Sequence, residues 1–299
     1  MPNNQPQEKS QPQVCVVTAV DIEFKTVAGL LSQKSFLSAH QIKICQGYID
    51  TVCVTLLQSE IGAINFEPRL AAHLAENQYD GLLVIGLAGA LDPKLRTGAI
   101  VLYDSCLKIS AQTIAASDVG RKKGKIRESI VSLSYENILT NALRDAFRDS
   151  KTDCYTGTGI TTDKMVIHKD GKLALGTALN ALAVDMESYG VIQTGLRYKL
   201  PIAVVRVVID EANQNTPDFN RALTPEGRTK IGALLLEMAS HPLVTFHFLQ
   251  TLRPSLSSLR QAAKVALSNQ AWQAFRTSRN DTNRVRTEPM PVDNSNSGR

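Results

Sequence analysis

Apolar and polar positions along the chain alternate between two periods, which predicts strands and helices in turn. Short runs rich in β-branched residues are typical of buried strands in a largely parallel sheet, and the segments between them have helical spacing. The predicted strands are residues 14–20, 42–46, 51–58, 81–87, 98–103, 181–184 and the run from 204. The predicted helices are 21–31, a segment ending at 76, 134–149, 169–177, 186–198 and 225–240.

This alternation of strands with helices predicts an α/β fold. We expect a single domain whose central twisted sheet is mixed, mostly parallel and flanked by helices. Glycines at residues 157–160 instead predict the start of a loop.

Composition changes at both ends of the chain and predicts four regions. Residues 1–12 are rich in Asn, Gln and Pro and are expected to be a disordered tail. Residues 13–240 form the predicted α/β domain, residues 241–273 a helical extension, and the polar residues 274–299 a disordered C-terminal tail. Residues 254–267 have an amphipathic pattern, for which packing on the domain, an oligomer interface and a membrane contact all stay open.

Charged side chains interrupt two segments where apolar core is expected. Residues 204–209 form a β-branched run broken by Arg206 and followed by Asp210. Period-two geometry places Arg206, Val208 and Asp210 on one face, with Asp210 at the strand end where open α/β sheets bind ligands. The second segment is the acidic run 185–187. Buried charges are costly unless they are paired or used, so both segments predict a functional site.

Charge and cysteine content narrow the class of protein. The 299 residues carry a formal net charge of +5 and are 43% hydrophobic, which is ordinary for a globular protein. The five cysteines are odd in number, form no CxxC pair and are expected to be reduced, as in a cytoplasmic protein. No Cys and His cluster has the spacing of a zinc site, and we expect neither a metal nor another cofactor.

The sequence also bears on a membrane and on nucleic acid as partners. No apolar stretch reaches the roughly 20 residues of a membrane span, although a peripheral contact with the inner membrane stays open. Nucleic acid is not expected as a partner, because aromatic residues make up only 5% of the chain and no recognition motif is present.

Four segments, in this order and spacing, resemble the nucleoside phosphorylase and nucleosidase superfamily. They are residues 14–23, residues 85–91 followed by 98–101, residues 183–188 and residues 201–210. The superfamily includes purine nucleoside phosphorylases and methylthioadenosine/S-adenosylhomocysteine nucleosidases, and the resemblance covers roughly residues 13–240. It implies an enzyme that breaks the N-glycosidic bond of a purine nucleoside, with phosphate or water as the acceptor, and that is a homo-oligomer.

The resemblance also implies a role for each acid. Asp210 would be the catalytic acid that gives a proton to purine N7, and Glu23 would orient or activate the attacking water. Glu187 would hold the ribose hydroxyls, and Met186 would pack against the ribose. Two simpler interpretations stay open: Glu23 as an acid favoured in the first turn of a helix, and Met186 as ordinary core.

The resemblance implies that the remaining site residues would contact the purine base or the acceptor. Met165 would stack on the purine, and backbone groups at Val166 would read its edge. Arg206 and Gly86 would belong to an anion-binding or hydrogen-bonding network. Leu87 stands where many members of the superfamily have a serine that holds phosphate or water, which puts the usual phosphate site in doubt.

Apolar residues such as Leu87, at positions where many members of the superfamily are polar, make the sequence similar to the hopanoid-associated phosphorylase branch. This resemblance implies adenosylhopane as a lipid-linked purine nucleoside that releases adenine. The first alternative is a methylthioadenosine/S-adenosylhomocysteine nucleosidase. The second is a non-catalytic nucleoside-binding protein, against which the retention of all three acids argues.

Overall fold

The computed structural model describes residues 11–60, 66–109, 131–134, 138–218, 240 and 242–287. The strands are β1 (Gln13–Thr18), β2 (Ser32–Ala39), β3 (Ile42–Ile49), β4 (Val52–Gln58), β5 (Gly81–Ala90), β6 (Ile100–Ile109), β7 (Val131–Ser134), β8 (Cys154–Thr162), β9 (Ala181–Asp185) and β10 (Ile202–Asp210). The helices are α1 (Asp21–Ala28), α2 (Phe66–Glu76), α4 (Ile138–Asp149), α5 (Lys169–Leu179), α6 (Ser188–Arg197), α8 (Pro242–Ala266) and α9 (Asn269–Thr287). The helix predicted at 225–240 lies outside the described residues except at its last position, and so do most of the predicted tails.

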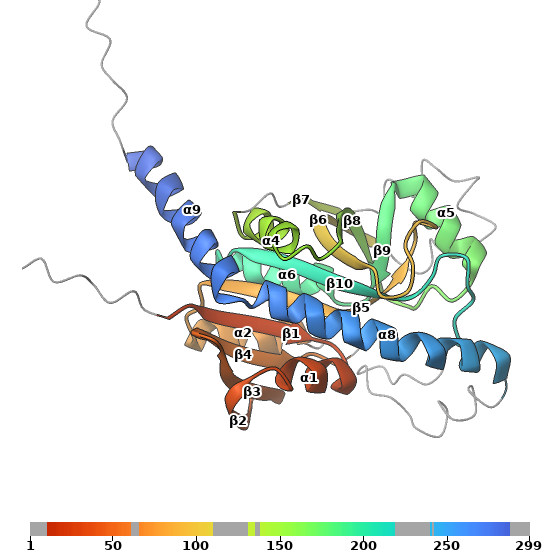
Figure 1. Cartoon of the computed structure of the whole chain (residues 1–299), viewed down its shortest axis with the longest axis horizontal. Helices are drawn as coiled ribbons and strands as arrows, with labels where there is room; N and C mark the ends of the chain where they lie inside the picture. Colours follow the sequence, from red (N-terminus) through yellow and green to blue (C-terminus); the bar gives the residue numbers. More distant parts are fainter. Residues whose placement is uncertain are drawn as a thin grey trace, which may run out of the picture.

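The strands form one mixed sheet, which confirms the predicted fold class (Figure 1). At its centre, β4, β1, β5 and β10 pair in parallel in that order, while β2, β3 and β4 form an antiparallel meander at one side. On the other side, the pairings β10–β6, β6–β8, β8–β9 and β9–β5 lead back to the β5–β10 pair. The sheet therefore closes on itself at this side, next to the carboxyl ends of β5 and β10.

Alternating side chains of each central strand enter two different cores. In β1, Val14 and Val16 pack with one apolar cluster, and Cys15 and Val17 pack with another. The first cluster includes side chains of α1, α4, α8 and α9, and the second those of α2 and α6. Figure 1 shows α8 running along one face of the sheet. Central strands covered on both faces explain why their sequence is almost continuously apolar.

One local prediction was wrong, and an edge strand was not predicted. The loop predicted at residues 157–160 is part of β8. Gly159 is needed there because a Cβ at this position would lie 1.9 Å from Cε2 of the buried Tyr103, so the glycine marks close packing and not a turn. Strand β2 was not predicted, because it is the exposed edge of the sheet and its sequence has no clear apolar side.

The C-terminal helices are longer than predicted and belong to the domain. Helix α8 begins at residue 242, close to the start of the predicted helical extension at residue 241. Helix α9 is helical to residue 287, so the predicted onset of disorder at residue 274 is wrong. Leu259, Trp272 and Phe275 are fully buried in the same cluster as β1. Their packing explains the order of this region, which composition alone does not indicate.

The amphipathic face of residues 254–267 packs on the sheet. Its apolar residues Leu259 and Ala263 are fully buried, and the hydroxyl of Ser255 donates a hydrogen bond to the carbonyl of Val208 in β10, at 2.9 Å. This face is therefore occupied by the domain and is not free to contact a membrane. Among the described residues, no helix is both long and apolar enough to cross a bilayer.

Candidate active site

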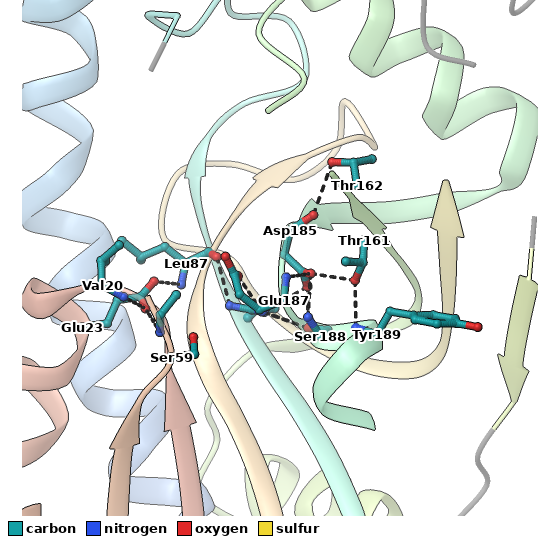
Figure 2. Close-up of polar contacts among 12 residues, drawn as sticks. Val20, Glu23, Ser59, Leu87, Thr161, Thr162, Asp185, Glu187, Ser188 and Tyr189 are labelled. Carbon is teal, nitrogen blue, oxygen red and sulfur yellow. Dashed lines mark hydrogen bonds and ion pairs between the residues drawn. The ribbon is translucent and has the colours of Figure 1, made fainter. Parts of the chain in front are cut away.

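The carboxyl ends of β1, β5 and β10 meet at one edge of the sheet, because these three neighbours run in parallel. Arg206 of β10 lies opposite Gly86 of β5. Glu23 comes from the first turn of α1, directly after β1. The acidic run 185–187 follows from the end of β9. The topology thus brings together four segments that are far apart in the sequence, as Figure 2 shows.

Glu23 is a buried carboxylate held by backbone amides. Its Oε2 accepts hydrogen bonds from the N–H groups of Ala19, at 2.8 Å, and Val20, at 3.1 Å. Its Oε1 accepts one from the N–H of Leu87, at 2.7 Å. Burial raises the pKa of Glu23 above its ordinary value of 4.5, against the lowering effect of Arg206 and of the three amides. The carboxyl is therefore fixed in position and its pKa is moved toward neutrality, as suits a general base.

The Glu23 pKa predicts an effect of pH on stability. A carboxyl whose pKa is raised on folding binds more protons in the folded state, so its contribution to stability is full below 4.5 and falls as pH rises through the raised value. In Glu23→Gln we expect this fall to be absent. Chemical denaturation at a series of pH values from 4.5 upward should show the free energy of unfolding of the wild type falling relative to that of the variant. A constant difference across this range would contradict the raised pKa.

Arg206 is fully buried and joins the acids. Its Nε lies 3.1 Å from Oδ2 of Asp185, and its Nη2 lies 3.3 Å from Oε2 of Glu187. Nη2 also donates to the hydroxyl of Ser188, at 2.9 Å. Burial alone would lower the pKa of Arg206, but Asp185 and Glu187 outweigh it, and the pKa is raised. The arginine thus stays charged, and its guanidinium N–H groups are directed at its carboxylate partners.

Asp185 is the hub of this network, a role that the sequence analysis did not assign. Its Oδ1 accepts hydrogen bonds from the Thr161 hydroxyl at 2.8 Å, the Glu187 N–H at 3.1 Å and the Ser188 N–H at 3.0 Å. Its Oδ2 accepts one from the Ser188 hydroxyl, at 2.5 Å, besides the contact with Arg206. With both oxygens occupied, Asp185 orients Glu187 and the guanidinium and has little capacity left for a ligand.

Gly86 lies directly beneath the side chains of this network. A Cβ at this position would lie 2.6 Å from Nη1 of Arg206 and 3.0 Å from Oε1 of Glu23. Both charged side chains therefore cross directly above the Gly86 backbone, and any larger residue would displace them. The predicted role of Gly86 in the network has this steric basis.

Asp210 lies further along β10 and has a different partner. A bulge between Val208 and Asp210 interrupts the strict alternation on which the predicted shared face rested. The buried Asp210 carboxylate forms an ion pair with Lys172 of α5, and its Oδ2 accepts a hydrogen bond from the Thr216 hydroxyl, at 3.0 Å. Lys172 was not among the site residues predicted from the sequence.

The other predicted residues lie around these acids. Met186 stands between Asp185 and Glu187 and is half-buried. Met165 and Val166 are half-buried in the segment between β8 and α5, where Val166 packs beside a small apolar cluster. This segment is hydrogen-bonded to the loop after β10, so the predicted base-binding residues lie on the Asp210 side of the site.

Cavities of 250 and 420 Å³ lie elsewhere, at the opposite edge of the sheet. The first is lined mainly by neutral polar residues, such as Gln13, Gln46, Asn77 and Gln78. The first holds no carboxylate, and Asp80, which lines the second, is paired with Arg276 at 2.7 Å. The cluster of buried acids is therefore a better candidate for the active site than either cavity. Within the described residues, no group of His, Cys, Asp and Glu side chains is placed to hold a metal ion.

Comparison with known proteins identifies the family to which the chain belongs. A family model described as the phosphorylase superfamily matches residues 13–240. This chain belongs to the phosphorylase superfamily. One relative of this superfamily member is the 5'-methylthioadenosine/S-adenosylhomocysteine nucleosidase of Staphylococcus aureus (strain JH9). The two are 25% identical over 199 residues, which cover 66% of this chain and 86% of the relative.

Solved structures show the same phosphorylase superfamily fold. The 5'-methylthioadenosine/S-adenosylhomocysteine nucleosidase of Neisseria meningitidis, in complex with methylthio-immucillin-A, has a TM-score of 0.63 and 18% identity and covers 86% of this chain and 99% of its own. Futalosine hydrolase of Helicobacter pylori has a TM-score of 0.60 and 14% identity and covers 89% and 98%. The family and its relatives show an enzyme of the nucleoside phosphorylase and nucleosidase type, which sets aside the non-catalytic alternative.

Proposed function

We propose that this enzyme hydrolyses the N-glycosidic bond of an adenine nucleoside and releases adenine. The observation that carries the proposal is the buried Glu23 carboxyl, fixed by three amides and raised in pKa, beside the Arg206 and Glu187 pair. Glu23 takes one proton from a water whose oxygen bonds to C1′ of the sugar. The electron pair of the C1′–N9 bond stays with adenine, and Asp210 supplies a proton to N7.

The charges around the sugar site support water as the acceptor over phosphate. Glu23, Asp185 and Glu187 bring three carboxylates together around Arg206, which contacts Asp185 and Glu187 directly. Carboxylates stabilise a sugar that becomes positive in the transition state, and they disfavour a phosphate anion. Leu87, at the position where phosphate is often held, presents an apolar side chain and an N–H that already binds Glu23.

For the 5' substituent, we propose the lipid-linked adenosylhopane, with methylthioadenosine and S-adenosylhomocysteine as the alternative. Leu87 supports an apolar site. Ile22 of α1 and Phe246 and Leu249 of α8, two helices that pack on each other, are 38%, 57% and 46% exposed. These apolar side chains would receive the hydrocarbon and would also be the place of a peripheral membrane contact.

A single panel of assays tests the proposal. Adenosylhopane in mixed micelles, methylthioadenosine, S-adenosylhomocysteine and adenosine are each incubated with and without phosphate, and adenine and the sugar product are separated by chromatography. We expect adenine and a free sugar at rates that do not depend on phosphate, and the highest kcat/KM for adenosylhopane. A sugar 1-phosphate would refute hydrolysis, and faster cleavage of methylthioadenosine would favour the alternative substrate.

A further inference from the structure

A fully buried lysine that no step above uses lies against the acid at the end of β10. Lys172 is 0% exposed, and its ammonium pairs with Oδ2 of Asp210. It also donates to the Glu211 carbonyl at 3.4 Å, the Gln214 carbonyl at 3.0 Å and the Thr216 hydroxyl at 2.9 Å. A buried charge is tolerated only where such partners offset its desolvation, so these four oxygens form a dedicated cage for the ammonium.

The cage contacts only one of the two carboxylate oxygens of Asp210. Oδ2 accepts hydrogen bonds from both Lys172 and Thr216, whereas Oδ1 has no hydrogen-bond partner among the residues that the structure describes. The carboxylate lies over Gly89, where an added Cβ would be 3.3 Å from Oδ2 and 3.4 Å from Oδ1. One oxygen is therefore fixed to the protein, and the other is left to meet a ligand.

The cage also ties Asp210 to the predicted base-binding segment. Lys172 lies in the first turn of α5, directly after that segment. Thr216 donates its backbone N–H to the carbonyl of Ile167, at 2.9 Å, two residues from Met165. The distance between the acid and a base held at residues 165–166 is therefore set through Lys172 and Thr216.

We propose that Lys172 is the positioning residue that presents Asp210 to the leaving base. The inference rests on the proposed nucleosidase function. Oδ1 of Asp210 takes up a proton from solvent before the reaction. When the C1′–N9 bond breaks, this proton moves to N7, and the carboxylate that results again faces the Lys172 ammonium. Lys172 acts through Asp210 and not on the substrate: its ammonium stabilises the charge that Asp210 gains as it gives up its proton.

Two leaving groups separate this role from a general structural one. Adenine needs a proton in order to leave, whereas the nitrophenolate of 4-nitrophenyl β-D-ribofuranoside leaves without one. In Lys172→Met we expect kcat for the adenine nucleoside to fall about 100-fold, the scale of general acid catalysis, with KM and nitrophenyl riboside cleavage changed by less than about threefold. The matched control is Lys169→Met, an exposed lysine of the same helix, which should leave both reactions unchanged.

Each outcome decides the inference. Equal loss on both substrates would show a structural role and overturn it, as would full activity of Lys172→Met on the nucleoside. If Lys172→Met does not fold, Thr216→Val removes the other donor to Oδ2 and should lower kcat for the nucleoside about tenfold while sparing the nitrophenyl riboside. A wild type that cleaves neither substrate would instead refute the proposed function.

A double variant gives the second readout. In an Asp210→Asn background, Lys172→Met should cause no further loss of nucleoside hydrolysis, because the group that Lys172 positions is already unable to give a proton. Losses that multiply in the double variant would show that Lys172 acts independently of Asp210 and would overturn the inference.

Discussion

Asp210→Asn is expected to bind an adenine nucleoside and to leave it intact. The amide oxygen of asparagine can accept the hydrogen bonds of Lys172 and Thr216, and its NH2 group can donate to purine N7. It has no acidic proton to transfer. Because a positioned general acid contributes about 10² to 10⁴ in rate, we expect kcat to fall by about 10³ with KM nearly unchanged.

The measurement combines single-turnover release of adenine with equilibrium binding of the nucleoside by calorimetry. Asp153→Asn serves as the matched control, since Asp153 is exposed just before β8 and should tolerate the change at full activity. Loss of nucleoside binding in Asp210→Asn would show that Asp210 holds the ligand. Full turnover would remove Asp210 from the chemistry.

The sequence predicted much of the carboxylate cluster, for a physical reason. Arg206 and the acidic run 185–187 break apolar strand patterns, and charges inside such patterns must find partners. The parallel pairing of β1, β5 and β10 then brings Glu23, Arg206 and Gly86 together at one edge. Local pattern and topology thus agree for this half of the site.

The sequence did not reveal Lys172, because its burial is a tertiary effect. In sequence it belongs to a polar first helical turn with Lys169 and Asp170, which resembles an ordinary solvated surface. Only the packing of α5 against the loop after β10 excludes water from Lys172 and leaves Asp170 exposed. The bulge before Asp210 is also invisible to a strict period-two reading.

Opposite electrostatic environments separate the two halves of the proposed site. The proposed sugar side combines Glu23, Asp185 and Glu187 with Arg206, whereas the proposed base side pairs Asp210 with Lys172. In the transition state the sugar becomes positive and the base becomes negative. In the proposed mechanism, carboxylates therefore lie beside the sugar, and a cation lies behind the acid that faces the base.

Arg206→Met is expected to be the most destabilising of these changes. Methionine replaces the stem of the side chain but leaves Asp185 and Glu187 buried without their cation, and it removes the attraction that opposes the raised pKa of Glu23. Breaking a buried ion pair by removing one partner costs about 3–5 kcal/mol, so the free energy of unfolding in urea should fall by that amount.

An exposed arginine provides the control for this prediction. Arg197 of α6 is 62% exposed and lies 3.8 Å from Glu67, and exposed pairs contribute about 0–1 kcal/mol, so Arg197→Met should change stability little. Arg206→Lys keeps the charge but loses the planar fork that reaches Asp185, Glu187 and Ser188 together, and it should lie between wild type and Arg206→Met. If Arg206→Met cost no more than Arg197→Met, the buried network would not be what holds these strand ends together, and Glu23 and Glu187 would need another explanation for their fixed positions.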